Sequence, residues 1–353
     1  MRQKYPFFYR ISIYLFLFSC IYILFRSQEQ ITEKVYSQGI YPYISSFCRF
    51  VLGIIPFSVG DILYILIPIG SIFWFIRSYK VLRKNPFIIL QKIILFITII
   101  ISSFYFLWGF NYYRVPLSKQ LGWELSYTEA DLEFVTDKLI REANGLHSLL
   151  STKPEELLSF PFTQKEIYDK IPQGYEIIRN KFPELILKGV SIKSSLYSKG
   201  LSYMGYSGYL NPFTGEAQVN SLAMQYSFPT VCAHEVAHQL GYASEKEANF
   251  IGFLATYHHP EPFFRYSGTL FALRYCLSEI RKSNPDNYTK KVALLREGIL
   301  ENYREASNFW RQYDNPLEVV FKESYDTFLK ANAQAGGIQS YDYVTSLLIH
   351  YLK

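Results

Sequence analysis

Three long apolar segments near the N-terminus constrain the fold of this chain more than any other feature. They span about residues 7–25, 54–76 and 87–110. Each reaches the roughly 20 residues that an α-helix needs to cross the hydrocarbon core of a bilayer. The only charged residues within them are Arg10, Asp61 and Lys92, and we take Asp61 as an interfacial residue. Residues 1–114 are therefore predicted to form a membrane domain of three transmembrane helices, with the lipid bilayer as its partner.

The first apolar segment has a second interpretation. Arg2 and Lys4 precede it and resemble the basic start of a cleaved signal peptide. Two more apolar segments follow it, however, which favours an uncleaved anchor.

The distribution of charge predicts the orientation in the membrane. Residues 1–114 contain twelve Lys and Arg but three Asp and Glu, a net charge of +9, whereas the remainder has 24 basic and 27 acidic residues. Four of the basic residues, Arg77, Lys80, Arg83 and Lys84, lie in the short loop between the second and third segments. The positive-inside rule places that loop in the cytoplasm, which puts residues 115–353 on the extracytoplasmic side of a bacterial inner membrane. Because the basic residues flank apolar segments, no nucleic-acid partner is expected.

Residues 115–353 have the pattern of a mainly helical globular domain of the α+β class. Residues 128–131 and 163–166 have the form of capping boxes, and each precedes apolar residues at helical spacing. Residues 187–221 instead combine scattered Val, Ile and Tyr with turn residues, which predicts a small sheet of short strands. Helical periodicity returns from Pro229 onward.

The motif H-E-x-x-H at residues 234–238 is the most informative segment of this domain. On a helix, His234 and His238 share one face, so that their imidazole nitrogens can converge on a Zn²⁺ ion. Glu235 then lies beside the metal, where a general base for water is needed. The flanking residues are small and apolar, which indicates a buried helix. The alternative is a pair of hydrogen-bonded core histidines without a metal.

A catalytic zinc site normally has a third protein ligand, which we expect soon after the motif. Gly241 is suited to end the first helix, and Ser244 and Glu247 have the spacing of a capping box for the next one. That assignment leaves Glu245 as the predicted third ligand, with Asn249 on the same face as a group that orients a ligand histidine. In the alternative assignment, Glu247 binds the metal and Glu245 is solvated.

The spacing of these residues resembles that of the gluzincin metallopeptidases, in which a second helix carries E-x-x-x-[DN] with the glutamate on zinc. The whole chain is similar to the bacterial membrane family called domain of unknown function 3810 (DUF3810). The features that carry this likeness are the three apolar segments and the motifs at residues 211–216, 234–241, 245–250 and 328–332. The resemblance implies a zincin-like metallopeptidase domain without a known substrate. It also implies that a strand near residues 216–220 binds an extended peptide.

Together these patterns favour a membrane-anchored zinc metallohydrolase, an enzyme that cleaves a peptide or other amide bond with Glu235 as its base. The alternative is a non-catalytic, zinc-stabilised membrane sensor or scaffold. Retention of Glu235 favours the enzyme, because a structural zinc site does not need that residue.

Overall fold

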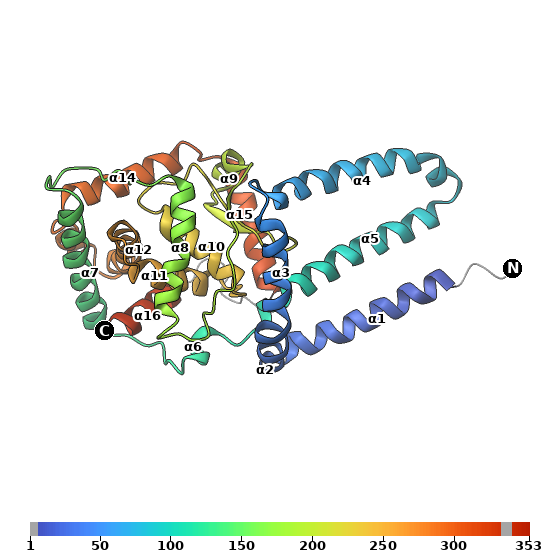
Figure 1. Ribbon diagram of the computed structural model, residues 1–353, viewed down its shortest axis with the longest axis horizontal. Helices are drawn as coiled ribbons and strands as arrows, with labels where there is room; N and C mark the ends of the chain where they lie inside the picture. Colours follow the sequence, from blue (N-terminus) through green and yellow to red (C-terminus); the bar gives the residue numbers. More distant parts are fainter. Residues whose placement is uncertain (1–5, 333–340) are drawn as a thin grey trace.

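The computed structural model describes residues 6–332 and 341–353, which form a helical body from which three long helices project (Figure 1). These are α1 (Pro6–Ser27), α4 (Val59–Lys84) and α5 (Pro86–Leu107). Val59–Tyr79 and Pro86–Leu107 are each long and apolar enough to cross a membrane. The first predicted span meets that criterion only when Ile11–Ser27 is joined to Glu29–Gly53 across a bend of 99°. Two or three helices can thus span a membrane, and the side on which the body lies stays a prediction.

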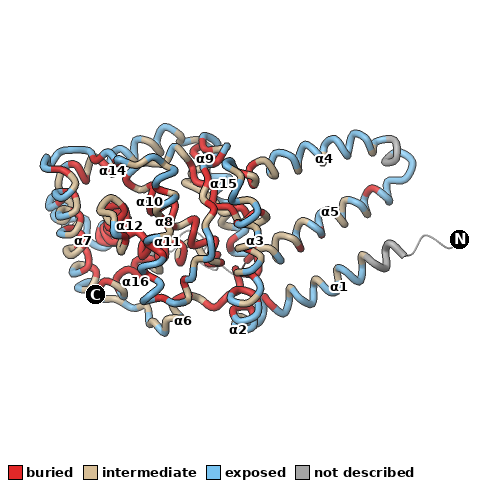
Figure 2. Tube along the Cα trace, viewed as in Figure 1, coloured by how far each residue is buried: buried red, intermediate tan, exposed pale blue. Residues whose placement is uncertain are grey.

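Apolar side chains cover the projecting helices. Phe16, Ile72 and Phe87 are each more than half exposed, and Figure 2 shows long exposed stretches along α1, α4 and α5. Side chains of this kind are stable in lipid but not in water.

Residues 29–53 form a helical bracket at the junction between the projecting helices and the body (Figure 1). The bracket consists of α2 (Glu29–Ile31), the π-helix η1 (Thr32–Ile40) and α3 (Tyr41–Gly53). Glu33 of η1 and Arg114 form a buried ion pair with a nitrogen–oxygen distance of 2.7 Å. The bracket therefore packs against the body.

The membrane helix α4 is anchored to the body at its N-terminal end. The backbone N–H of Gly60 donates to Glu216 Oε2 at 2.7 Å, and Glu216 also pairs with Lys193. A carboxylate at this position satisfies N–H groups that have no partner within the helix. Asp61, two residues from the start of this candidate span, is fully buried and accepts from the backbone N–H of Leu196, and its interfacial position stays a prediction.

Helices make up most of the body. The long ones are α7 (Glu129–Leu150), α8 (Gln164–Ile178), α10 (Phe228–Gln239), α11 (Glu245–Tyr257), α12 (Pro262–Ser283), α14 (Glu297–Arg311), α15 (Pro316–Ala331) and α16 (Tyr341–Leu352). The shorter ones are η2 (Gly109–Tyr113), α6 (Leu117–Gln120), α9 (Ser198–Met204) and α13 (Pro285–Val292). The capping boxes predicted at residues 128–131 and 163–166 are confirmed, at the starts of α7 and α8. The predominantly buried helices α10, α11 and α12 pack together at the centre of the core.

The predicted small sheet is present and is mixed. Its strands are β1 (Ile192–Ser194), β2 (Gly208–Leu210) and β3 (Ala217–Val219), in the order β1-β3-β2. Strand β3 is parallel to β1 and antiparallel to β2, with Val219 opposite both Ser194 and Gly208. The expectation that residues 216–220 pair with a peptide is therefore wrong, because both edges of β3 are already paired. The strand nearest the metal motif with an outer edge is β2.

Candidate metal centre

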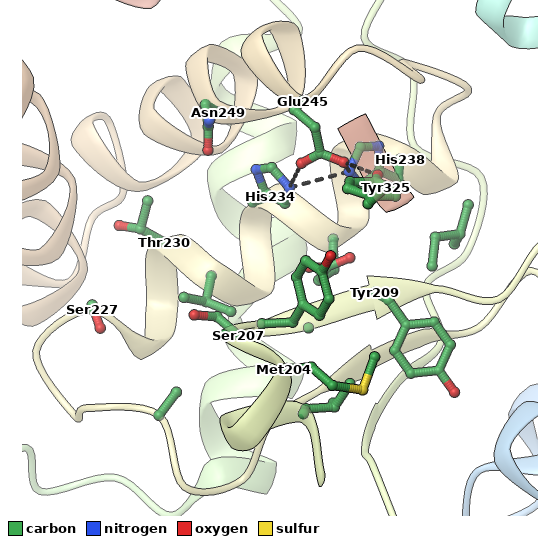
Figure 3. A pocket seen from close by; sticks show the side chains of 18 of the residues that line it. Met204, Ser207, Tyr209, Ser227, Thr230, His234, His238, Glu245, Asn249 and Tyr325 are labelled. Carbon is green, nitrogen blue, oxygen red and sulfur yellow. Dashed lines mark hydrogen bonds and ion pairs between the residues drawn. The ribbon is translucent and has the colours of Figure 1, made fainter. Parts of the chain in front are cut away.

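The two histidines of the motif lie one turn apart on the buried helix α10, as the sequence predicted. Their Nε2 atoms are 3.1 Å apart. The helix ends at Gly241, whose φ of 84° lies in the left-handed region, and the chain then reverses into α11. Glu245 is the first residue of α11, and its Oε2 lies 3.2 Å from His234 Nε2 (Figure 3). Its Oε1 lies 3.6 Å from His238 Nε2.

The spacing of these three side chains fits a zinc ion. Tetrahedral zinc with ligands at about 2.0–2.1 Å separates neighbouring donor atoms by about 3.3–3.4 Å. The histidine nitrogens are 3.1 Å apart, and the two oxygens of Glu245 lie 3.2 and 3.6 Å from them, so these distances are close to that value. Two imidazoles and one carboxylate are also a donor set that catalytic zinc sites use.

Hydrogen bonds around His238 prepare its ring for metal binding. Its Nδ1 lies 2.7 Å from the backbone oxygen of Tyr242, which can only accept, so Nδ1 carries a proton. In the neutral ring Nε2 is then unprotonated and faces His234 and Glu245. His234 Nδ1 is buried and has no hydrogen-bond partner among the described residues.

The charges in the site favour a protonated imidazole when no metal is bound. Burial alone would lower the pKa of His238, but the carboxylates of Glu245 and Glu235 outweigh it and raise that pKa to about 9. Burial would likewise raise the pKa of Glu245, yet the two histidines hold it well below its usual value.

Zinc binding to the full-length protein should therefore release protons. His238 is charged at pH 7, below its pKa of about 9, and it must be neutral to bind a metal. We expect release of about one to two protons per zinc at pH 7, one from His238 and a fraction from Glu235 with its pKa of about 7, and an affinity that rises up to about pH 9. Calorimetric titration in two buffers with different ionisation enthalpies measures this proton. Equal heats in both buffers would contradict the expectation.

Glu235 lies beside the two histidines but has a different environment. One of its carboxylate oxygens lies within 4.8 Å of a ring nitrogen of each histidine. Burial raises its pKa to about 7, against the lowering effect of the histidines. Oε2 has no hydrogen-bond partner among the described residues. The other oxygen lies against Gly208 of β2, where a Cβ atom would be 2.6 Å from it.

Tyr325 is a site residue that sequence reasoning missed. It comes from α15, and its hydroxyl donates to Glu245 Oε1 at 2.5 Å (Figure 3). Burial and the neighbouring carboxylate raise its pKa well above the usual value, so the hydroxyl keeps its proton. The chain contains 31 tyrosines, and nothing in the sequence near Tyr325 distinguishes it.

The predicted capping box at the start of α11 is absent. Ser244 is the N-cap residue, but its side chain makes no capping hydrogen bond. Glu247 is buried and accepts from the backbone N–H of Leu117 at 2.6 Å, because the chain before α6 packs against the first turn of α11. Glu245, rather than Glu247, lies beside the histidines. Glu247 is held away from this position by its bond to Leu117 and not by a capping box.

Asn249 lies one turn after Glu245 on α11. Its Nδ2 donates to Tyr275 Oη at 3.2 Å, and the described residues include no hydrogen bond from it to a histidine. Its expected role in orienting a ligand stays a prediction.

Comparison with known proteins places the chain in a family. Residues 36–349 match the family model described as "Protein of unknown function (DUF3810)". The chain belongs to this family. No curated protein and no solved structure matches it.

The matched region of this DUF3810 protein begins within η1, so it includes most of the helical bracket, and the bracket supplies donors to the C-terminal end of α10. The last carbonyls of a helix have no partner within it. Here Tyr41 Oη donates to Gln239 O at 3.0 Å, and Arg49 Nη1 donates to the same oxygen at 3.2 Å. Trp108 Nε1 donates to His238 O at 3.3 Å. Side chains from the N-terminal third of the chain thus hold the backbone of His238, a candidate ligand, and of Gln239.

A cavity of about 1000 Å³ opens beside the metal centre of the DUF3810 protein. His234, Glu235, His238 and Glu245 all contribute to its lining. Much of the rest is apolar and comes from several elements, including α9, β2, α12, α14 and α15, with Met204 and Tyr209 among these residues (Figure 3). A cavity of this size, largely apolar with a few convergent polar groups, is typical of a ligand-binding site.

Proposed function

We propose that this protein is a membrane-bound, zinc-dependent hydrolase of peptide or other amide bonds. One observation carries the proposal: the donor atoms of His234, His238 and Glu245 converge at zinc-like separations, and the free carboxylate of Glu235 lies beside them in the wall of a large cavity. A structural zinc site usually has four protein ligands and does not need an additional buried acid.

Zinc, when bound, would polarise the substrate carbonyl and make water more acidic. Glu235 accepts a proton from the attacking water as its oxygen bonds to the carbonyl carbon. The protonated Glu235 then gives that proton to the nitrogen as the carbon–nitrogen bond breaks, leaving a carboxylate and an amine. A pKa of about 7 in the metal-free protein suits a group that takes up and releases a proton near neutral pH.

Two neighbouring features support this assignment. The hydroxyl of Tyr325 holds Glu245 in position from a different helix. Strand β2 contributes Gly208 and Tyr209 to the cavity wall, and its outer edge offers backbone groups to an extended substrate. The absent side chain at Gly208 lets the strand approach Glu235 closely.

The second candidate is a non-catalytic sensor or scaffold that uses zinc for stability. The candidate ligands come from two helices, so that zinc would link α10 to α11, and His238 is buried while His234 and Glu245 are half-buried, which favours this role. A sensor or scaffold role would not explain why the carboxylate of Glu235 lies beside the candidate ligands.

Removal and replacement of the metal tests the proposal. The full-length protein, purified in detergent with zinc, should hydrolyse members of a mixed peptide pool, with new termini identified by mass spectrometry. A chelator should abolish the cleavage, and zinc should restore it, because only the metal can supply the electrophile. Cleavage that persists after verified zinc removal would rule out the zinc mechanism. A zinc-loaded protein that cleaves neither peptides nor simple amides would favour the scaffold.

A further inference from the structure

The cavity at the metal centre is continuous with the membrane-spanning helices. Tyr64 of α4 and Phe104 of α5 line the same cavity as His234 and His238. Tyr64 is five residues from the start of the span Val59–Tyr79, and Phe104 is three residues from the end of Pro86–Leu107. At a rise of 1.5 Å per residue, both lie roughly 5–8 Å inside their spans. One end of the cavity is therefore at the depth where headgroups meet acyl chains.

Helix α15 connects this end of the cavity to the metal centre. Tyr325 bonds to Glu245, while Asn332, just after the helix, accepts from the hydroxyl of Tyr105 on α5 at 2.8 Å. Phe328 packs edge-on against Phe104 of α5, with ring centroids 5.9 Å apart.

The outer surface of α15 is unusually apolar for a helix in water. Leu317, Val319 and Val320 are each more than half exposed. Exposed apolar residues beside a cavity that reaches two membrane helices indicate a helix that rests on lipid.

We propose that the cavity binds the hydrocarbon chain of a lipid-anchored amide, such as an N-acylated peptide, which enters from the bilayer and presents its amide bond to the metal centre. The acyl chain would lie among the aromatic side chains between α4, α5 and α15. The identity of the bond that is cut rests on the proposed function. The binding of an acyl chain in the cavity does not depend on it.

The size of the cavity favours a single chain over a transmembrane helix. A helix of about 10–12 Å diameter would fill roughly 1000 Å³ with only about two turns. A transmembrane helix would also have to unwind before its backbone could reach the histidines at the other end of the cavity. An extended hydrocarbon chain is much thinner than a helix and leaves room for the polar group that follows it.

Photo-cross-linking tests the inference without requiring cleavage. The probe is an N-palmitoyl dipeptide amide with a diazirine at the methyl end of its chain. It is added to the full-length protein in lipid nanodiscs, and labelled residues are mapped by mass spectrometry. We expect label on the cavity-lining residues Tyr64, Phe104 and Phe328. Unlabelled N-palmitoyl dipeptide amide should compete, and the dipeptide amide without the acyl chain should not.

A variant that narrows the cavity provides the matched comparison. Met204→Trp adds bulk to the cavity wall and should lower this labelling about tenfold, the effect of displacing about two methylene groups. Leu149→Trp, at an exposed position on α7 outside the cavity, should leave it unchanged. Label spread over all lipid-facing residues without competition, or equal labelling in Met204→Trp, would overturn the inference.

Two further results separate this inference from the proposed function. Specific labelling without hydrolysis by the zinc-loaded protein would leave the lipid-chain site standing and remove the hydrolase. If soluble peptides are hydrolysed as fast as their acylated forms and no specific labelling occurs, the hydrolase stands and the lipid-chain site is ruled out. Competition by a transmembrane helical peptide but not by the acylated dipeptide would identify a protein segment as the occupant and contradict the inference.

Discussion

Glu235→Gln should keep zinc in the full-length protein while turnover falls by roughly 10²–10⁴, the usual effect of removing a general base. The substitution preserves the shape of a side chain that is buried against Gly208, so the fold should survive. Glutamine cannot accept the proton of the attacking water. The measurements are zinc content by metal analysis and the initial rate of peptide or amide hydrolysis.

Glu245→Gln should behave differently, because a neutral amide is a poor zinc ligand. We expect zinc affinity to fall by more than about 100-fold, since loss of a group that only supports a ligand costs about 10–100-fold. Glu247→Gln is the matched control two residues away, because its acceptor role toward Leu117 N–H survives in the amide. If Glu247→Gln loses zinc and Glu245→Gln retains it, the ligand assignment is wrong. If Glu235→Gln cleaves at the wild-type rate, the proposed mechanism fails.

The parts of the site that follow from local sequence were predictable. His234 and His238 are one helical turn apart, and a chain that reverses at Gly241 returns Glu245 to the same place. Such relations depend only on helix geometry and one turn. The apolar segments and the capping boxes of α7 and α8 are local in the same sense.

The groups that support the site come from distant parts of the chain, and no local pattern identifies them. Tyr325 is 80 residues from Glu245, and Tyr41 is 198 residues from Gln239. Each is one tyrosine among 31. Glu247 is a case in which a local pattern was misleading. Its spacing from Ser244 predicted a capping box, but in the fold its carboxylate accepts from the backbone N–H of Leu117 instead. Local spacing thus predicted the candidate ligands, but only the tertiary contacts define what holds them.

These distant contacts bear on the sequence-based division at residue 114. An aromatic cluster lies across that boundary and includes Tyr36, Tyr41, Trp108 and Phe110 on one side and Leu329 on the other. Large aromatic side chains bury about 150–250 Å² each, so this cluster makes a substantial contribution to stability. The donors to the carbonyls of His238 and Gln239 lie on the N-terminal side as well. The metal helix therefore depends on the membrane half of the chain.

A fragment that begins at Leu117 should consequently fail to bind zinc as a monodisperse protein, whereas a chain that begins at Gln28 should bind one zinc per chain. Both lack α1, but only the first lacks the bracket and Trp108. The expected loss is large, because the deletion removes the aromatic residues that cover Leu329 and Tyr325 and the donors to the carbonyls of His238 and Gln239, whereas domains are usually stable by only about 5–15 kcal/mol. Size-exclusion chromatography with metal analysis distinguishes the two fragments. In the full-length chain, Tyr41→Phe removes one of the donors to Gln239 O, which keeps Arg49 as a donor, and should destabilise the protein by only about 0.5–1.5 kcal/mol without aggregation. A folded, zinc-loaded fragment from Leu117 would show that the metal centre is independent of the membrane half, and the contacts of Tyr41, Arg49 and Trp108 would then have no role in holding it.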